Sequence, residues 1–178
     1  ERNTWIEIQH LLHNKKAKVL DIACGTGKVI EILKKTNDSE IFGCDISDFL
    51  ISKALKRGIS NTQLKVCDAT NLPYYENEFD FCYSIGSLEH FTEEGIVKFL
   101  KSSKRVTRHS GFHLVPVSKS NIDEGWINNY QSYFNNSENW WLNISKSVFD
   151  NVQILDSSWE DDLSIGKWLI LNKDNYKN

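Results

Sequence analysis

The order of apolar segments along the chain restricts its fold more than any other feature. Short apolar runs typical of buried strands alternate with segments whose apolar residues recur at helical spacing. We predict strands over 17–22, 41–44, 64–67, 79–85 and 112–117, with helices over 49–57 and 92–106. Two last strands, 152–159 and 167–172, should form an antiparallel pair. This order is typical of an α/β fold: a Rossmann-like doubly wound sheet, mostly parallel with an antiparallel last strand pair, and helices on both faces.

The ends of the chain and its length add three expectations. Thr4-x-x-Glu7 is a capping-box pattern, which predicts that a short first helix opens at Thr4. A length of 178 residues fits one domain, 1–178, with the segment 118–149 as an insertion that includes a helix over 138–148. The chain begins at Glu1 and contains no Met, which indicates that residues are missing from the sequence.

Composition narrows the classes of partner. Lys plus Arg number 21 against 24 Asp plus Glu, a net charge of −3, and this lack of a basic excess argues against a nucleic-acid partner. No run of 18 apolar residues is present, which argues against a membrane span. The four cysteines lack zinc-module spacing and no signal peptide precedes them, so we expect no metal site and a cytoplasmic location.

A glycine-rich turn between the first strand and its helix predicts a nucleotide site. Gly25 and Gly27 allow a ligand to approach the backbone closely, with a helix N-terminus behind them. Asp45, at the end of the second strand, can accept from both hydroxyls of a ribose. A dinucleotide fold expects a third glycine where this chain has Ile30, and Asp21 would repel a pyrophosphate but attract an ammonium group.

Four segments in order resemble the motifs of class I S-adenosylmethionine-dependent methyltransferases, with the closest likeness to the small-molecule (methyltransferase type 11-like) branch. The matching segments are Val19-Leu-Asp-Ile-Ala-Cys-Gly-Thr-Gly27, Gly43-Cys-Asp45, Cys67-Asp-Ala69 with Asn71-Leu-Pro73, and Phe79 through His90. The resemblance covers roughly residues 15–117 by motif. It departs from the family before the fifth strand, where only Arg108–Gly111 takes the place of a longer turn.

The resemblance implies S-adenosylmethionine as the cofactor and S-adenosylhomocysteine as its product. The backbone of Ala23, Gly25 and Gly27 would face the methionine part of the cofactor. Asp21 would lie near its amino group, and Asp45 would hold the ribose hydroxyls.

The same resemblance assigns the remaining cofactor contacts. Ile46 would lie against the adenine, Asp68 would accept from its amino group, and Ala69 would meet a ring nitrogen. Ser84 and Ile85 would close the methionine end.

His90 is the candidate catalytic residue. It follows the fourth strand and could act as a general base, because the ordinary pKa of histidine lies near neutrality. The alternative is a histidine that caps or packs beneath the next helix. Glu89 could orient His90, but we expect it to be solvated.

The acceptor is predicted to be a small molecule methylated at O, N or C, with no nucleic acid and no membrane as partner. Ser84-Ile-Gly-Ser87 replaces the Asn/Asp-Pro-Pro-aromatic run of enzymes that methylate nucleic-acid amino groups. Residues 118–149 are rich in aromatic side chains and could form a substrate cap, or could pack into the sheet edge. The candidate pocket residues are Trp126, Tyr130, Tyr133 and Trp140.

Two other functions stay open at this point. A non-catalytic regulatory or scaffold protein could keep an S-adenosylmethionine pocket, and an NAD-dependent oxidoreductase is weakened by Ile30. The oligomeric state has no signal in the sequence.

The cysteines gather near the carboxyl ends of the first four strands. Strand alternation predicts that Cys44 and Cys67 point away from the neighbouring acids into the helix layers. We expect unpaired, protonated thiols, with Cys24 as the reactive exception because its turn adjoins a helix N-terminus.

Overall fold

The molecule is built on one twisted seven-stranded sheet, seen in a computed structural model that describes residues 2–13, 16–128 and 131–173. The strand order is β3-β2-β1-β4-β5-β9-β8. Its strands are β1 (Lys18–Ile22), β2 (Glu40–Asp45), β3 (Leu64–Val66), β4 (Phe79–Ile85), β5 (Thr107–Ser118), β8 (Asn151–Glu160) and β9 (Ser164–Asn172). β9 runs antiparallel to both of its neighbours, and the other pairs are parallel. The predicted Rossmann-like sheet and its antiparallel last pair are confirmed.

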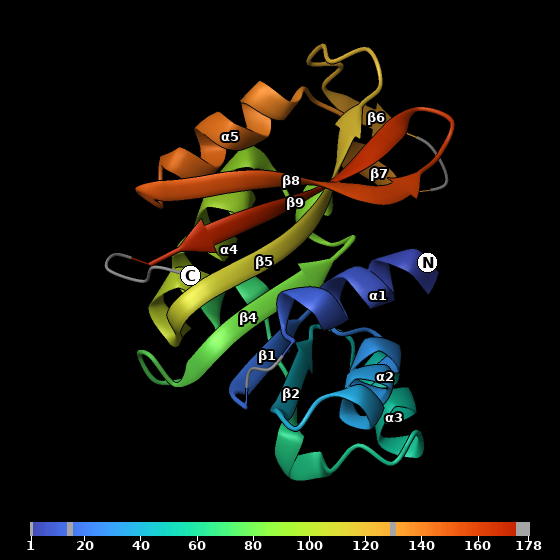
Figure 1. The fold of residues 1–178 in the computed structure, drawn as a ribbon, viewed down its shortest axis with the longest axis vertical. Coiled ribbons are helices and arrows are strands. Elements are labelled where there is room, and N and C mark those ends of the chain that lie inside the picture. Colours follow the sequence, from blue (N-terminus) through green and yellow to red (C-terminus); the bar gives the residue numbers. More distant parts are fainter. Residues whose placement is uncertain (1, 14–15, 129–130, 174–178) are drawn as a thin grey trace.

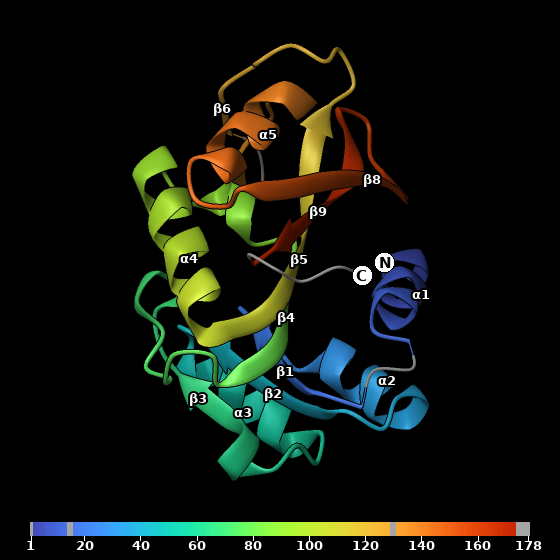
Figure 2. The same ribbon diagram turned by 60° about the vertical axis from the view of Figure 1, so that its left-hand side comes forward.

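Helices cover both faces of the sheet (Figures 1 and 2). One face carries α1 (Arg2–Leu11), α2 (Lys28–Thr36) and α3 (Asp48–Lys56), and the other carries α4 (Glu93–Val106) and α5 (Glu138–Lys146). Strand alternation divides the apolar side chains into two cores: Val19 faces the first group of helices and Leu20 the second. None of the described helices has the length and apolar character of a membrane span.

The first helix begins differently from its prediction. α1 already includes Arg2, so Thr4 lies inside the helix and the capping-box prediction is wrong. Glu7 instead accepts hydrogen bonds from Ser157 and Ser158 of β8 and from the indole of Trp168 in β9. The glutamate therefore joins α1 to the far edge of the sheet.

β5 follows α4 without a connecting turn. Thr107, the residue after the helix, is already extended, so the predicted turn Arg108–Gly111 is part of the strand. The register between β4 and β5 shifts between Phe79 and Phe81, which accommodates this abrupt start.

The segment 118–149 contains a small hairpin that the sequence did not reveal. β6 (Trp126–Asn128) pairs with β7 (Ser132–Phe134), and short 3-10 turns η1 (Asn61–Gln63), η2 (Ala69–Asn71) and η3 (Leu88–His90) lie elsewhere along the chain. The predicted helix after the hairpin is α5. Its Trp141 is fully buried and donates from its indole to the Pro116 carbonyl at 2.8 Å, so α5 packs onto the sheet.

Candidate active site at the carboxyl end of the sheet

The glycine-rich turn after β1 forms a strained backbone loop. Ala23, Gly25 and Gly27 all have positive φ, at 59°, 54° and 70°. A side chain at Gly27 would clash, since an added Cβ would lie 2.4 Å from the Ile59 Cδ1. The Asp45 carboxylate fixes this loop, because it accepts from the Gly25 amide at 2.9 Å and also from the Ser47 amide at 2.9 Å. The predicted turn and acid therefore lie together.

Asp21 occupies the inner wall of this loop. Its side chain is buried and accepts a hydrogen bond from the Tyr83 hydroxyl at 2.8 Å. Burial raises the pKa of Asp21 and outweighs the Tyr83 hydrogen bond, and the nearby Asp45 carboxylate adds to the rise. A buried carboxyl group at a cavity wall fits a ligand ammonium group, whose charge would stabilise the ionised form.

The other predicted cofactor residues divide into two groups. Ile46 is 73% exposed beside Asp45, and Phe49, which was not predicted, is 62% exposed, so both offer apolar surface that an adenine ring can cover. Asp68 is exposed and caps η2 by accepting from Thr70, and Ala69 is buried behind it. This arrangement fits the adenosine part of S-adenosylmethionine.

Of the two residues predicted to close the methionine end, one has its side chain at the cavity. Ile85 lines the cavity, but the Ser84 hydroxyl is fully buried on the opposite face, 2.8 Å from the His113 Nδ1. Neighbouring strand residues point to opposite faces, so only the Ser84 backbone can lie near the ligand.

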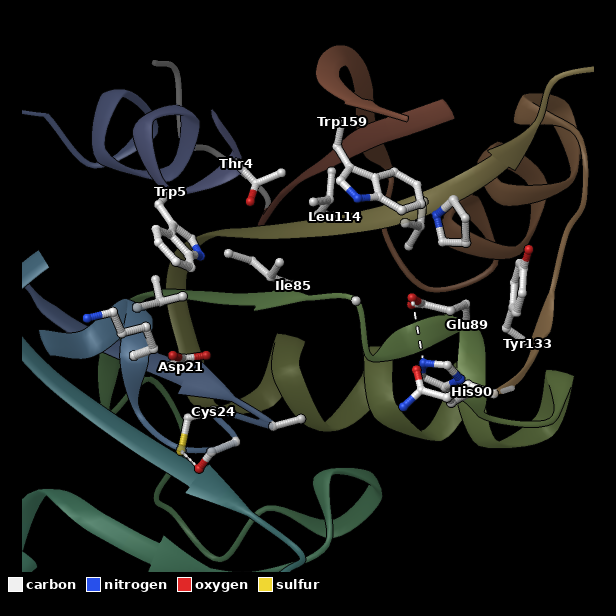
Figure 3. Close-up of a pocket in the computed structure, with 18 of the residues that line it drawn as sticks. Thr4, Trp5, Asp21, Cys24, Ile85, Glu89, His90, Leu114, Tyr133 and Trp159 are labelled. Carbon is white, nitrogen blue, oxygen red and sulfur yellow. Dashed lines mark hydrogen bonds and ion pairs between the residues drawn. The ribbon is translucent and has the colours of Figure 1, made fainter. Parts of the chain in front are cut away.

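A cavity of about 970 Å³ extends from the turn across the carboxyl ends of β4 and β5 (Figure 3). Its near end includes Asp21, Cys24 and Lys28, and its far end includes Tyr133 of β7 and Trp159 of β8. The volume exceeds the needs of the methionine part of the cofactor, so it leaves space for an acceptor.

The predicted pocket aromatics are mostly elsewhere. Tyr133 lines the cavity, whereas Trp126 packs edge-on against Phe134 and Trp140 packs against Trp141. Tyr130 lies outside the described residues.

Two tryptophans that line the cavity lie outside the segment 118–149, where the pocket aromatics were predicted. Trp5 comes from α1 and Trp159 from β8, and Figure 3 shows both rings over the cavity. No local pattern marks them, because only the folded topology brings the first helix and the end of β8 to the same edge.

Glu89 is not solvated, contrary to the prediction. It is 7% exposed, and its Oε2 has no hydrogen-bond partner in the part of the chain that the structure describes. Its Oε1 lies 3.9 Å from the Nε2 of His90, whose Nδ1 is 2.8 Å from the Ser132 carbonyl oxygen on β7. Burial raises the pKa of Glu89 to about 7, against smaller lowering effects of its own backbone and of His90.

The surroundings of the thiols favour a different order of reactivity from the predicted one. Burial and the carboxylates of Asp21 and Asp45 raise the pKa of Cys24, which argues against its predicted role as the reactive exception. Cys44 is buried, and its thiol hydrogen-bonds with that of the half-buried Cys67, which lowers the pKa of Cys67.

Comparisons with known proteins agree with this geometry. A family model described as "Methyltransferase domain" matches residues 19–111. A S-adenosylmethionine-dependent methyltransferase from Methanosarcina mazei superposes with a TM-score of 0.75 at 17% identity, covering 93% of this chain and 96% of that one. That similarity shows the fold.

Several curated relatives are named as tRNA methyltransferases, and two of them are described below. The chain is 34% identical over 120 residues to the probable tRNA methyltransferase 9B of Mus musculus, covering 66% of this chain and 26% of that protein. It is 39% identical over 101 residues to the tRNA (carboxymethyluridine(34)-5-O)-methyltransferase of Arabidopsis thaliana, covering 56% and 23%. The chain thus spans about a quarter of the length of these relatives.

These relatives overturn one prediction. A small-molecule acceptor with no nucleic-acid partner was expected from the net charge and from the lack of an Asn/Asp-Pro-Pro-aromatic run, and that expectation is wrong. The missing run is typical of enzymes that methylate nucleic-acid amino groups, so its absence does not exclude methylation of an oxygen. The net charge describes the whole chain and does not exclude a tRNA substrate. The matched family, the motifs and the sheet order lead to one assignment: the chain belongs to the methyltransferase domain family and is a class I S-adenosylmethionine-dependent methyltransferase.

Proposed function

We propose that this chain methylates tRNA, and that the acceptor is the carboxylate of a carboxymethyl-modified uridine. The observation that carries the proposal is the 39% identity over 101 residues to a relative named for that reaction. The cavity beside that turn supplies the space for the acceptor.

A carboxylate acceptor suits the chemistry of this site. S-adenosylmethionine supplies an electrophilic methyl group on a positively charged sulfur. A carboxylate is already ionised at neutral pH and needs no general base, so the protein has chiefly to align the attacking oxygen with the methyl carbon. His90, predicted as a general base, then has no proton to remove, and its contact with Ser132 instead holds β7 against η3.

The aromatic lining supports a nucleobase as the bound group. Trp5, Tyr133 and Trp159 line the cavity, and an unpaired base can stack on such rings. Tyr133 belongs to the hairpin within 118–149, so the substrate-cap role proposed for this segment falls on β6 and β7, while α5 packs on the sheet. A cytoplasmic location stays a prediction.

Two cationic residues line the same cavity on its turn side. Lys28 and Arg57 each lie close to Glu31, at 3.0 Å and 3.1 Å, and both reach the cavity wall. A local pair of this kind can meet a phosphate although the whole chain is slightly acidic.

The proposal is tested by methyl transfer from radiolabelled S-adenosylmethionine to tRNA. The substrate is tRNA that carries unmethylated carboxymethyluridine, and the comparison is the same tRNA with plain uridine at that position. We expect label in the first and not in the second, and alkali should release it because the product is an ester. Equal labelling of both tRNAs, or label that resists alkali, would reject the carboxylate acceptor.

A further inference from the structure

Glu89 is the buried polar group that the cofactor site leaves unused. Four side-chain atoms in the described part of the chain are buried without a hydrogen-bond partner, and the Glu89 Oε2 is the one whose residue lines the cavity. A buried carboxyl oxygen without a partner costs free energy, so a ligand that bonds to it would regain that cost. The orphan atom therefore points to a bound group.

The position of Glu89 is set by the turn that ends β4. Gly86 has a φ of 64°, and its missing Cβ would lie 3.6 Å from the Glu89 Oε1, so the carboxyl group rests on this glycine. Figure 3 shows the Glu89 carboxyl group directed into the cavity, level with Ile85 and Leu114, and joined to His90 by the ion-pair contact. An acceptor that enters from the Trp159 side meets Glu89 before it reaches the turn.

The charges around Glu89 favour its protonated form. No lysine or arginine forms a described ion pair with it, and the nearest ionisable partner is His90, at 3.9 Å. The other ionisable side chains that line the same cavity are Asp21 from β1, Cys24 from the turn, Lys28 from α2, Arg57 from the end of α3, Tyr133 from β7, and Asp161 and Asp162 from the turn between β8 and β9. Three of these are carboxyl groups, whose negative charges would oppose ionisation of Glu89, and the two cations Lys28 and Arg57 are paired with Glu31.

We infer that Glu89 is the residue that recognises the acceptor, because its protonated carboxyl group can donate a hydrogen bond to one oxygen of the acceptor carboxylate. This inference rests on the proposed function. The second carboxylate oxygen stays free to attack the methyl carbon: the new C–O bond forms as the C–S bond breaks, the carboxylate loses its negative charge and the sulfonium its positive charge. The Glu89 proton does not move in this step. An ionised Glu89 would instead repel the acceptor.

The test measures binding of the free nucleoside 5-carboxymethyluridine to the chain saturated with S-adenosylhomocysteine, at pH 6 and pH 8. The acceptor carboxylate is ionised at both values. For the wild type we expect affinity to fall about tenfold between them, as a carboxyl group of pKa about 7 ionises. Glu89→Gln keeps an N–H donor without a titratable proton, so it should bind at both pH values about as tightly as the wild type does at pH 6.

His90→Asn is the matched control, because a histidine could also lose a positive charge over this range. It should keep the wild-type fall in affinity if Glu89 is responsible. A fall that persists in Glu89→Gln and vanishes in His90→Asn would overturn the inference and transfer the role to His90. Uridine that binds the wild type as tightly as 5-carboxymethyluridine would overturn it as well.

Methyl transfer to tRNA separates this inference from the proposed function. If the wild type labels carboxymethyluridine tRNA and Glu89→Gln labels it at pH 8 at least as fast, both stand. If the wild type labels the tRNA, and Glu89→Gln binds S-adenosylhomocysteine but is inactive at every pH, a hydrogen-bond donor at this position is not sufficient and only the inference fails. A wild type that neither labels this tRNA nor binds the nucleoside removes both.

Discussion

At the scale of single residues, Asp45 orders the turn, and we expect it to bind the ligand as well. Its two oxygens accept from the Gly25 and Ser47 amides, and their remaining lone pairs can accept from the ribose hydroxyls that the resemblance assigns to this residue. The sequence predicted the second role from the position of the acid. The first could not be predicted, because the register of β1 and β2 decides which amides the carboxylate reaches.

Asp45→Ala should weaken the binding of S-adenosylhomocysteine by about 1.5–3 kcal/mol, since hydrogen bonds to a charged group are lost. Isothermal titration calorimetry measures the effect. Asp38→Ala is the matched control, because Asp38 is exposed in the loop that enters the opposite end of β2. Unchanged affinity in the Asp45 variant would remove this residue from the cofactor site.

The alkylation rates of the four thiols test the packing around the turn. Cys67 should alkylate first, because the hydrogen bond with the Cys44 thiol lowers its pKa and the residue is only partly buried. Cys24, Cys44 and Cys82 should react slowly: burial raises the pKa of Cys24 and Cys82, and the hydrogen bond with Cys67 together with burial raises that of Cys44. Mass spectrometry of the natively alkylated protein identifies the order, and Cys67→Ser should remove the fast phase. A fast phase on Cys24 would contradict the described burial.

At the scale of elements, one carboxylate ties α1 to β8 and β9, in addition to the burial of Ile8 in the core. Glu7 accepts from Ser157, Ser158 and Trp168, and the same helix carries Trp5 over the cavity. Burial raises the pKa of Glu7, but these hydrogen bonds outweigh burial and lower it. The stabilisation by Glu7 is therefore present above the ordinary glutamate pKa and is lost as pH falls through the lowered value.

Glu7→Ala should lower the free energy of unfolding by about 1–3 kcal/mol at pH 7, an estimate reduced for the partial exposure of the carboxylate. The difference from the wild type should be smaller at about pH 3, because the charge is lost as the pH falls from the ordinary glutamate pKa of about 4.3 through the lowered value. Urea denaturation at both pH values measures it. Glu94→Ala, which removes only an exposed pair with Lys98 on α4, should change stability by less than about 0.5 kcal/mol. Equal losses in the two variants would show that Glu7 is no more than a surface charge.

Three aromatic rings from distant elements line one cavity: Trp5 of α1, Tyr133 of β7 and Trp159 of β8. Trp159→Ala should weaken the binding of 5-carboxymethyluridine by about 1–3 kcal/mol through lost stacking, and should leave S-adenosylhomocysteine binding unchanged. Trp126→Ala is the matched control, because that ring is partly exposed and packs on Phe134 away from the cavity. Nucleoside binding that falls equally in both variants would indicate a general loss of folding instead of a stacking contact.

At the scale of the whole molecule, local patterns predicted the sheet and the turn but not the acceptor site. β4 was predicted at its observed ends, because a continuous apolar run between turn residues is a strong strand signal. β6 and β7 have three residues each, too short for any periodicity, and β5 began where the sequence suggested a turn. Trp5, Glu89 and Trp159 meet only through contacts between the first helix, the end of β4 and the end of β8, which no local pattern encodes.

The net charge led to the wrong prediction of no nucleic-acid partner for a related reason. A total of −3 averages over the whole surface, whereas binding depends on the groups at one edge of the sheet. The proposed acceptor rests instead on the groups that line the cavity and on the names of the relatives.

The most direct test of the central claim is nucleoside mass spectrometry of tRNA incubated with the chain and S-adenosylmethionine. We predict that carboxymethyluridine disappears, that a nucleoside heavier by one methyl group replaces it, and that mild alkali restores the original nucleoside. A methyl group gained by any other nucleoside, or an unchanged nucleoside profile while the chain demonstrably binds S-adenosylhomocysteine, would contradict the account.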